Sequence, residues 1–175
     1  MNYATIKNCD IANGVGVRVS LFVSGCTHRC KNCFNQEAWD FEYGQKFDED
    51  IQNKLLKMLA PSYIKGLSLL GGEPFEPSNV KGLLEFVKKV SKIENKDVWA
   101  YTGYTLEQLL AREGEDGKNT RELLSYIDIL VDGPFIEEKK SLRLKFRGSA
   151  NQRLIDLKKT LESGEITLAD IKDRT

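Results

Sequence analysis

The chain has 175 residues, and its 26 Lys and Arg residues are balanced by 26 Asp and Glu residues. This length fits one domain with one sizeable core. The zero formal charge argues against a strongly basic, nucleic-acid-binding surface. The apolar stretches are far shorter than a membrane-spanning helix, and the first residues lack the features of a secretory signal. We therefore expect a cytoplasmic protein that binds neither nucleic acid nor membrane.

Four short segments predict buried strands, because they are rich in β-branched and aromatic residues and end at turn-forming residues. They are residues 18–23, 64–70, 98–102 and 128–131. Four amphipathic segments between them predict helices. These are residues 47–59, 80–93, 105–112 and 120–126, with Asp48 and Thr105 as N-caps. Strands that alternate with helices predict an α/β fold with a parallel sheet, whose functional residues gather at the carboxyl ends of the strands.

The remaining segments are less regular. Residues 113–119 are polar and contain two glycines, which predicts a surface loop. Residues 142–146 alternate as in a strand, and residues 154–157 fit a last edge strand. Residues 158–175 form a weakly periodic tail that we expect to be helical or disordered. The main domain is therefore placed at residues 1–157.

Three of the four cysteines fall within eight residues, directly after the first expected strand. Cys26, Cys30 and Cys33 form a C-x3-C-x2-C pattern. A reducing compartment disfavours disulfides, so metal binding or catalysis is the better explanation for such a group. Thiolates are soft ligands that suit zinc, Cu(I) or an iron–sulfur cluster. We interpret the three cysteines as metal ligands and catalytic residues.

A closed metal site needs a fourth ligand, for which Cys9 and His28 are the candidates. Cys9 precedes the first expected strand and should emerge at the opposite, amino end of the sheet. His28 lies on the short loop between two ligands and would have to fold back on the same metal. Without them, three thiolates leave one coordination position open, as in a catalytic metal site. A structural zinc site completed by Cys9 and a fully ligated, ferredoxin-like electron carrier are the alternatives.

The cysteine pattern resembles that of the radical S-adenosylmethionine superfamily, whose hallmark is C-x3-C-x2-C after the first strand. Gly71, Gly72, Glu73 and Pro74 resemble the GGEP motif that ends the second strand in this superfamily. The resemblance implies a partial, open parallel β/α barrel. It also implies a [4Fe–4S] cluster held by three cysteines, with a fourth iron that binds S-adenosylmethionine.

The same resemblance assigns further residues to the cofactor. The glycine motif takes the methionine amino group, and glycines suit this role because a missing Cβ lets a ligand approach the backbone closely. Beside the cluster, the expected cofactor-binding residues are Asn32, Cys33 and Phe34. At the ends of the third and fourth strands they are Thr102 and Asp132, and a simple turn role for Asp132 stays open.

Motifs along most of the chain narrow the resemblance to the activating proteins of anaerobic ribonucleoside-triphosphate reductase. They are Asn13-Gly14 with Gly16 and Arg18, residues 21–26, Thr102-Gly103-Tyr104, Asp132-Gly133-Pro134-Phe135, and the loop 147–153. The last of these is expected to contact the cofactor or the reductase. Activators of pyruvate formate-lyase share the first two motifs but are longer, and they are the alternative within the superfamily.

This family resemblance also implies a mechanism and two protein partners. A flavodoxin-type donor reduces the cluster, and S-adenosylmethionine is cleaved to methionine and a 5′-deoxyadenosyl radical. The radical then removes a hydrogen atom from the α-carbon of a glycine in the partner, the anaerobic ribonucleoside-triphosphate reductase. The expected contribution of the chain is placement, because a cofactor that carries the hard chemistry still needs binding, orientation and protection from water.

Overall fold

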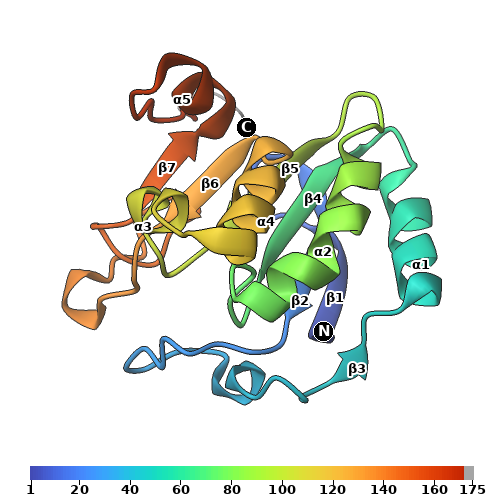
Figure 1. Cartoon of the computed structure of the whole chain (residues 1–175), viewed down its shortest axis with the longest axis horizontal. Helices are drawn as coiled ribbons and strands as arrows, with labels where there is room; N and C mark the ends of the chain where they lie inside the picture. Colours follow the sequence, from blue (N-terminus) through green and yellow to red (C-terminus); the bar gives the residue numbers. More distant parts are fainter. Residues whose placement is uncertain (172–175) are drawn as a thin grey trace.

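The computed structural model describes residues 1–171. Its strands form one seven-stranded sheet in the order β3-β1-β2-β4-β5-β6-β7 (Figure 1). The strands are β1 Asn2–Asp10, β2 Val17–Val23, β3 Gln45–Lys46, β4 Ile64–Gly71, β5 Asp97–Tyr101, β6 Ile129–Asp132 and β7 Arg153–Asp156. The strands β2, β4, β5 and β6 pair in parallel in this order, whereas the pairings of β1, β3 and β7 are antiparallel. The expected open parallel sheet is therefore confirmed for the four central strands, and antiparallel strands extend it on both sides.

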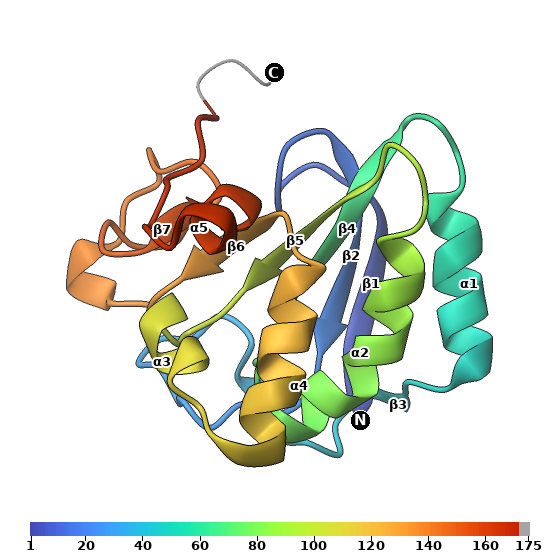
Figure 2. The ribbon, with the colours of Figure 1, turned by 45° about the horizontal axis from the view of Figure 1, so that its top comes forward.

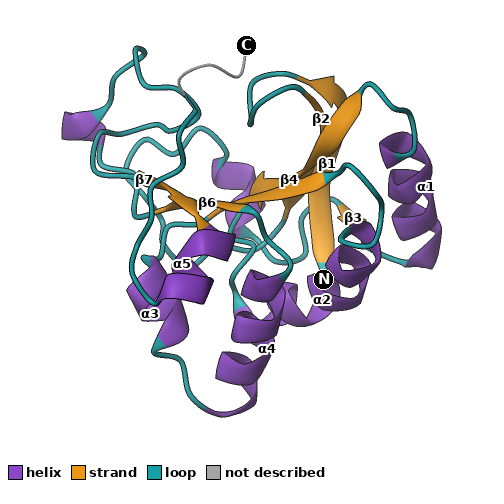
Figure 3. Ribbon diagram, turned by 90° about the horizontal axis from the view of Figure 1, so that it is seen from above, coloured by secondary structure: helices purple, strands orange, loops and turns teal. Residues whose placement is uncertain are grey.

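Five α-helices and two short 3-10 helices complete the described part of the chain (Figure 2). They are η1 Gln36–Trp39, α1 Glu49–Leu59, α2 Pro77–Val90, α3 Leu106–Leu110, α4 Gly114–Ser125, η2 Glu137–Lys139 and α5 Leu157–Ser163. The parallel strands are joined through α1, α2, and α3 with α4, all of which lie on one side of the sheet (Figure 3). This arrangement is that of successive βαβ units.

Helix starts follow from local hydrogen bonds. The Asp48 side chain accepts a hydrogen bond from the Ile51 amide at 3.0 Å and begins α1. Thr105 and Gln108 form a reciprocal capping box at the start of α3. Pro77 stands in the first turn of α2, where its missing N–H is not needed. Both expected N-caps are confirmed.

The expected surface loop at residues 113–119 is wrong, because α4 begins there. Glu115 and Asp116 lie in its first turn, where acidic side chains favour a helix. Gly117 allows this turn to lie close to the preceding chain, since a Cβ there would be 2.1 Å from the Arg112 carbonyl oxygen. Of the two glycines that suggested a loop, Gly117 is required by this close approach to the chain before the helix.

Strands outside the parallel core depart further from the expectations. β1 is nine residues long, but its polar sequence and many exposed positions conceal it. The expected strand at residues 142–146 is wrong: this segment forms turns and bends. Its alternation has another cause, because its apolar side chains face a cavity described below. The expected edge strand at residues 154–157 is confirmed as β7, one residue earlier in the chain.

Strand side chains alternate between the two faces of the sheet. Leu21 and Leu69, which are paired in β2 and β4, are fully buried with the helices in the main core. The other face of the sheet carries the side chains of Arg18 in β2, Ser68 in β4 and Trp99 in β5. Loops cover this face instead of helices. This second face is therefore where a ligand finds room.

The C-terminal tail folds back on the sheet. Asp156 caps α5, and the segment after α5 pairs with β7 through the Ala169 amide, which donates to the Leu154 carbonyl oxygen at 2.8 Å. Residues 172–175 of the expected tail lie outside the described residues. Within residues 1–171, no helix has both the length and the apolar character needed to cross a membrane.

Candidate metal and cofactor site

A cavity of about 520 Å³ lies at the carboxyl ends of the parallel strands, on the face without helices. This volume is typical of small-molecule sites. The expected site residues that line it are Cys26, Cys30, Asn32, Cys33, Phe34, Gly71, Gly72, Glu73 and Thr102. Segments that are far apart in the sequence therefore meet around one space.

The cysteine loop turns sharply so that all three thiols reach this cavity. Cys26 follows β2 closely and is buried, whereas Cys30 and Cys33 are half-buried. The Cys33 amide donates to the Cys30 carbonyl oxygen at 3.2 Å. Arg29 and Asn32 have φ angles of 48° and 58°, in the left-handed region that asparagine tolerates better than most residues. The result is a compact set of soft donors.

Burial governs the protonation of these thiols. It raises the pKa of Cys26 to about 11, and the charges of Glu73 and Glu76 add to the increase. Burial also raises the pKa of Cys30. Such thiols keep their protons at neutral pH until a cation binds, so metal loading must release protons. Because the donors are three thiols on one cavity wall, they fit an iron–sulfur cluster chemically.

The fourth cysteine lies elsewhere. Cys9 is inside β1, one residue before Asp10, which pairs with Arg18 near the start of β2. Cys26 follows the other end of β2, so about 20 Å of strand separates the two cysteines. The expected position of Cys9 at the opposite end of the sheet is confirmed, although it lies within a strand. A zinc site that combines Cys9 with the other three is therefore excluded.

Within residues 1–171, no three His, Cys, Asp or Glu side chains surround a single metal-ion position. A [4Fe–4S] cluster places a different iron at each cysteine and so does not require its ligands to converge on one point.

The glycines after β4 bring the backbone against the cysteine loop. The Gly72 amide donates to the Val23 carbonyl oxygen at 2.7 Å, and the Glu73 amide donates to that of Gly25 at 2.8 Å. A Cβ at Gly72 would lie 2.5 Å from the Gly25 oxygen, and Gly71 has a φ angle of 115°. Both positions require glycine. They also leave this wall of the cavity without side chains, which suits close approach of a ligand to the backbone.

The buried carboxylate of Glu73 joins three segments. Its Oε1 accepts a hydrogen bond from the Phe75 amide at 2.9 Å, and its Oε2 accepts one from the Gly103 amide at 2.8 Å. Nε2 of His28 lies 3.0 Å from the same Oε2, and this contact raises the pKa of His28. The cysteine loop, the turn after β4 and the end of β5 therefore meet at one side chain.

His28 is engaged in this contact instead of ligating a metal. Its ring packs on Tyr104 with 4.3 Å between the ring centroids. A Cβ at Gly103 would lie 2.7 Å from the imidazole, so this glycine makes room for the ring. We conclude that His28 positions the cysteine loop, and this contact could not be read from the spacing of the motif.

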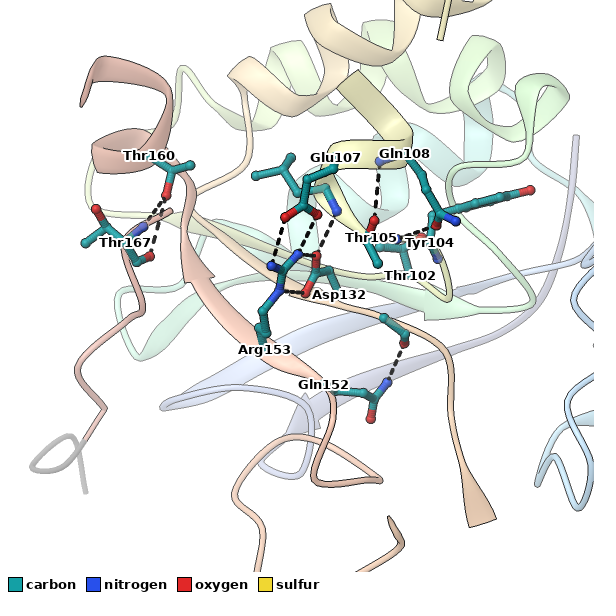
Figure 4. A network of polar contacts seen from close by, with 12 residues as sticks. Thr102, Tyr104, Thr105, Glu107, Gln108, Asp132, Gln152, Arg153, Thr160 and Thr167 are labelled. Atoms are coloured by element: carbon teal, nitrogen blue, oxygen red, sulfur yellow. Dashed lines mark hydrogen bonds and ion pairs between the residues drawn. The ribbon is translucent and has the colours of Figure 1, made fainter. Parts of the chain in front are cut away.

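Asp132 differs from the other expected site residues because it does not line the cavity. Its carboxylate pairs with Arg153, with 2.9 Å between Nε and Oδ1, and accepts a hydrogen bond from the Leu106 amide at 2.7 Å (Figure 4). Arg153 also binds Glu107 at 2.7 Å. These contacts join β6, β7 and α3. The surroundings of Asp132 therefore support a structural role and give no support to the expected cofactor contact.

Some residues of the loop 147–153 line the cavity, and others only hold the loop in place. Arg147 and Gln152 line the cavity. Gln152 also donates to the Gly133 carbonyl oxygen at 3.0 Å and thereby holds the loop against the end of β6. Asn151 and Arg153 do not line the cavity.

Thr102 lines the cavity at the end of β5, and its Oγ1 accepts a hydrogen bond from the Tyr104 amide at 3.1 Å. The side chain thus shapes the turn that brings Gly103 to Glu73. Thr102 combines a place in the site with a local structural role.

Comparison with known proteins places the chain in a family. The sequence model of a family described as "4Fe-4S single cluster domain" matches residues 12–155. An anaerobic ribonucleoside-triphosphate reductase-activating protein of Pasteurella multocida is 46% identical over 155 residues, which cover 87% of this chain and 95% of the relative. The proteins of the same name from Haemophilus influenzae and Escherichia coli K12 are 45% and 38% identical, and in both cases 87% of this chain and 96% of the relative are covered.

The chain belongs to the family of anaerobic ribonucleoside-triphosphate reductase-activating proteins. The resemblance stated from its motifs is confirmed. The match to the 4Fe-4S family supports an iron–sulfur cluster in this chain.

Sequence reasoning missed several residues that this family member places in the cavity wall. They include Trp39, Tyr101, Phe135 and the apolar residues Leu142, Leu144 and Phe146. Tyr101 faces the cavity because its strand neighbour Ala100 belongs to the main core on the other face of the sheet. Trp39 enters the site from a 3-10 helix, and no local pattern in the sequence marks it.

Proposed function

We propose that the chain activates an anaerobic ribonucleoside-triphosphate reductase by creating a glycyl radical in it, with S-adenosylmethionine as the source of the radical. The observation that carries the proposal is the shared cavity of the three cysteines and the Gly71-Gly72 turn, in a member of this family. The proposal assigns the chemistry to a domain of residues 1–157 in the cytoplasm. Residues 158–175 are the tail that follows this domain in the chain.

In this proposal Cys26, Cys30 and Cys33 hold three irons of a [4Fe–4S] cluster, and the fourth iron is left for S-adenosylmethionine. When bound and reduced by one electron from a flavodoxin-type donor, the cluster would supply the cleavage of S-adenosylmethionine to methionine and a 5′-deoxyadenosyl radical. This radical would take the α-hydrogen of a glycine and become 5′-deoxyadenosine. The sheet is then a partial, open barrel of the radical S-adenosylmethionine type.

The residues of the chain position the reactants. The bare backbone at Gly71 and Gly72 receives the methionine end of the cofactor. Glu73 and His28 hold the cysteine loop against this wall, because they share a buried hydrogen bond. Asn32, Phe34 and Thr102 contact the cofactor from the cavity wall, while Asp132 supports the site from behind by joining β6 to β7.

An open cavity suits a protein substrate. A glycine backbone segment of another chain must come within contact distance of the 5′ carbon, and a fixed geometry at this distance accelerates the transfer greatly. The same closeness protects the reactive species from water.

The test is anaerobic reconstitution with iron and sulfide, followed by addition of S-adenosylmethionine and a reductant. We expect 5′-deoxyadenosine, and a glycyl-radical signal in electron paramagnetic resonance once the reductase is added. A fully loaded protein that forms no 5′-deoxyadenosine would contradict the proposal. A radical formed on pyruvate formate-lyase but not on the reductase would show that the partner is wrong.

A further inference from the structure

Residues 140–147, here called the rim segment, lie beside the cavity and are held at both ends. A bridge joins Lys140 to Ser149, and the Ala150 amide donates to the Lys139 carbonyl oxygen at 2.8 Å. The Phe146 ring packs edge-on against Trp99, with 5.4 Å between ring centroids. The rim segment therefore has fixed inner and outer sides although it belongs to no strand.

The two sides of the rim segment differ in chemistry. Leu142, Leu144 and Phe146 line the cavity. Arg143 and Lys145, which alternate with them, are exposed and do not line it. The alternation that looks like a strand thus separates the apolar side chains, of which Leu144 and Phe146 are partly buried and Leu142 is exposed at the mouth, from the exposed basic ones.

The positive charge on this segment is unbalanced. The rim segment contains four basic residues, Lys140, Arg143, Lys145 and Arg147, and no acidic one, although Glu137 and Glu138 precede it in the chain. Lys140 has an acidic neighbour, Glu137, at 3.7 Å. Arg143 and Lys145 have no acidic partner among residues 1–171.

The cysteine loop contributes more positive charge to the same mouth. Arg29 and Lys31 are exposed on either side of Cys30, whose side chain lines the cavity. Neither side chain lines the cavity itself, but the Arg29 guanidinium lies 5.7 Å from the centre of the Trp39 ring, which does. A surface of this kind attracts an acidic partner and speeds its association.

Two large apolar side chains are exposed at the opening. Leu142 is 97% exposed and Phe34 is 85% exposed, and both also line the cavity. Exposed apolar groups beside a cavity and within a charged border are typical of a surface that another protein covers. Their position gives the partner an apolar contact next to the entrance.

We propose that the rim segment, together with Arg29 and Lys31, is the docking surface for an acidic segment of the reductase that flanks the radical-bearing glycine. The inference rests on the proposed function, which brings a glycine backbone into the cavity. Since a cavity of about 520 Å³ must also hold the cofactor, the residues that flank the glycine have to remain outside, against the rim. Acidic flanking residues pair with Arg143 and Lys145, and apolar ones pack on Leu142.

The test compares the double variant Arg143→Glu/Lys145→Glu with wild type in anaerobic binding titrations of the reductase. We expect affinity to fall about 10- to 100-fold at low salt, with a smaller difference at about 0.3 M salt, where charges are screened. The matched control is Lys54→Glu/Lys57→Glu on α1, at the opposite side of the molecule (Figure 1, Figure 2). The control should bind the reductase as wild type does.

A second readout separates this inference from the proposed function. Cleavage of S-adenosylmethionine by dithionite-reduced protein, without the reductase, should be equal in wild type and the double variant, because neither substituted residue lines the cavity. Absence of cleavage in wild type would overturn the proposed function. Unchanged reductase affinity in the double variant would overturn the docking surface. Loss of flavodoxin-driven reduction with unchanged reductase affinity would also overturn it, since the rim would then bind the electron donor.

Discussion

The two faces of the sheet divide stability from chemistry. On the helix-covered face, alternate strand residues such as Leu21 and Leu69 are completely buried in one continuous apolar core. On the other face, polar and aromatic side chains underlie a cavity bordered by loops. The helix-covered face therefore fixes the positions of the strand ends, and the other face stays free for ligands.

The loop-covered face is itself organised below the cavity. The Arg18 side chain is completely buried, binds Asp97 at 2.6 Å and donates to the Ser68 hydroxyl at 2.7 Å. Its guanidinium also lies 5.3 Å from the centre of the Trp99 ring. A buried charge with partners of this quality is costly to disturb. Polar contacts thus support this face at the amino end of the strands, and the site occupies the carboxyl end.

The largest effect should come from substitution of the cysteines, which should abolish activity and leave the apolar core intact. Cys30→Ala or Cys33→Ala should reduce 5′-deoxyadenosine formation to background, because the cluster loses a ligand. The unfolding free energy of the metal-free protein should change by less than about 1 kcal/mol. Iron content, product analysis and urea unfolding check this. Cys9→Ala is the control and should retain its iron. If this variant lost the cluster, Cys9 would be a fourth thiolate ligand.

The converse substitution is Phe86→Ala in α2, on the helix-covered face. Phe86 is fully buried and packs edge-on against Phe47 at 5.4 Å between ring centroids. We expect a loss of about 3–5 kcal/mol of unfolding free energy. The iron bound per folded molecule should stay the same, since no cavity residue is touched. A folded variant with impaired cluster loading would show that the two faces are coupled.

A smaller effect is expected from His28→Ala, which changes the support of the cysteine loop and leaves the three thiols in place. The substitution removes a hydrogen bond to the buried Glu73 and the packing on Tyr104. We expect the cluster to be lost about tenfold faster to a chelator, which corresponds to about 1.5 kcal/mol, the low end for one hydrogen bond to a charged group. His28→Gln should restore part of the retention. Equal rates in wild type and both variants would exclude a positioning role.

The smallest effect concerns the contact between β7 and α3. The hydrogen bond from Arg153 lowers the pKa of Glu107 to about 2 from an ordinary 4.5. A lowered carboxylate pKa stabilises the fold above the ordinary value, and this stabilisation is lost as the pH falls from about 4.5 towards 2. Urea unfolding should therefore show a weaker loss of stability between pH 5 and about 3 in Glu107→Gln than in wild type. Parallel pH profiles would mean that the pair contributes nothing.

The sequence predicts what is local. The central strands and the caps Asp48 and Thr105 follow from periodicity and from side chains three residues away. The joint role of the cysteines and the Gly71-Gly72 turn is implied by the family resemblance of their motifs, and it agrees with the rule that parallel strands end at the same edge of a sheet. These expectations needed no knowledge of long-range contacts.

Long-range contacts account for what the sequence did not reveal. His28 and Glu73 are 45 residues apart, and Arg153 and Glu107 are 46 residues apart. Asp132 lies at a strand end like the site residues, but its partner on β7 directs it to a structural role. The alternation at residues 142–146 predicts a strand because it shows that successive side chains have different surroundings. It does not show what those surroundings are.

The most direct test of the account is electron paramagnetic resonance of the reduced, reconstituted protein with and without S-adenosylmethionine. If three cysteines leave one iron free, the cofactor must change the spectrum of the cluster at stoichiometric binding. The same change should appear in Cys9→Ala. A spectrum that is identical with and without the cofactor in a fully loaded protein would contradict the open iron on which the proposed activity depends.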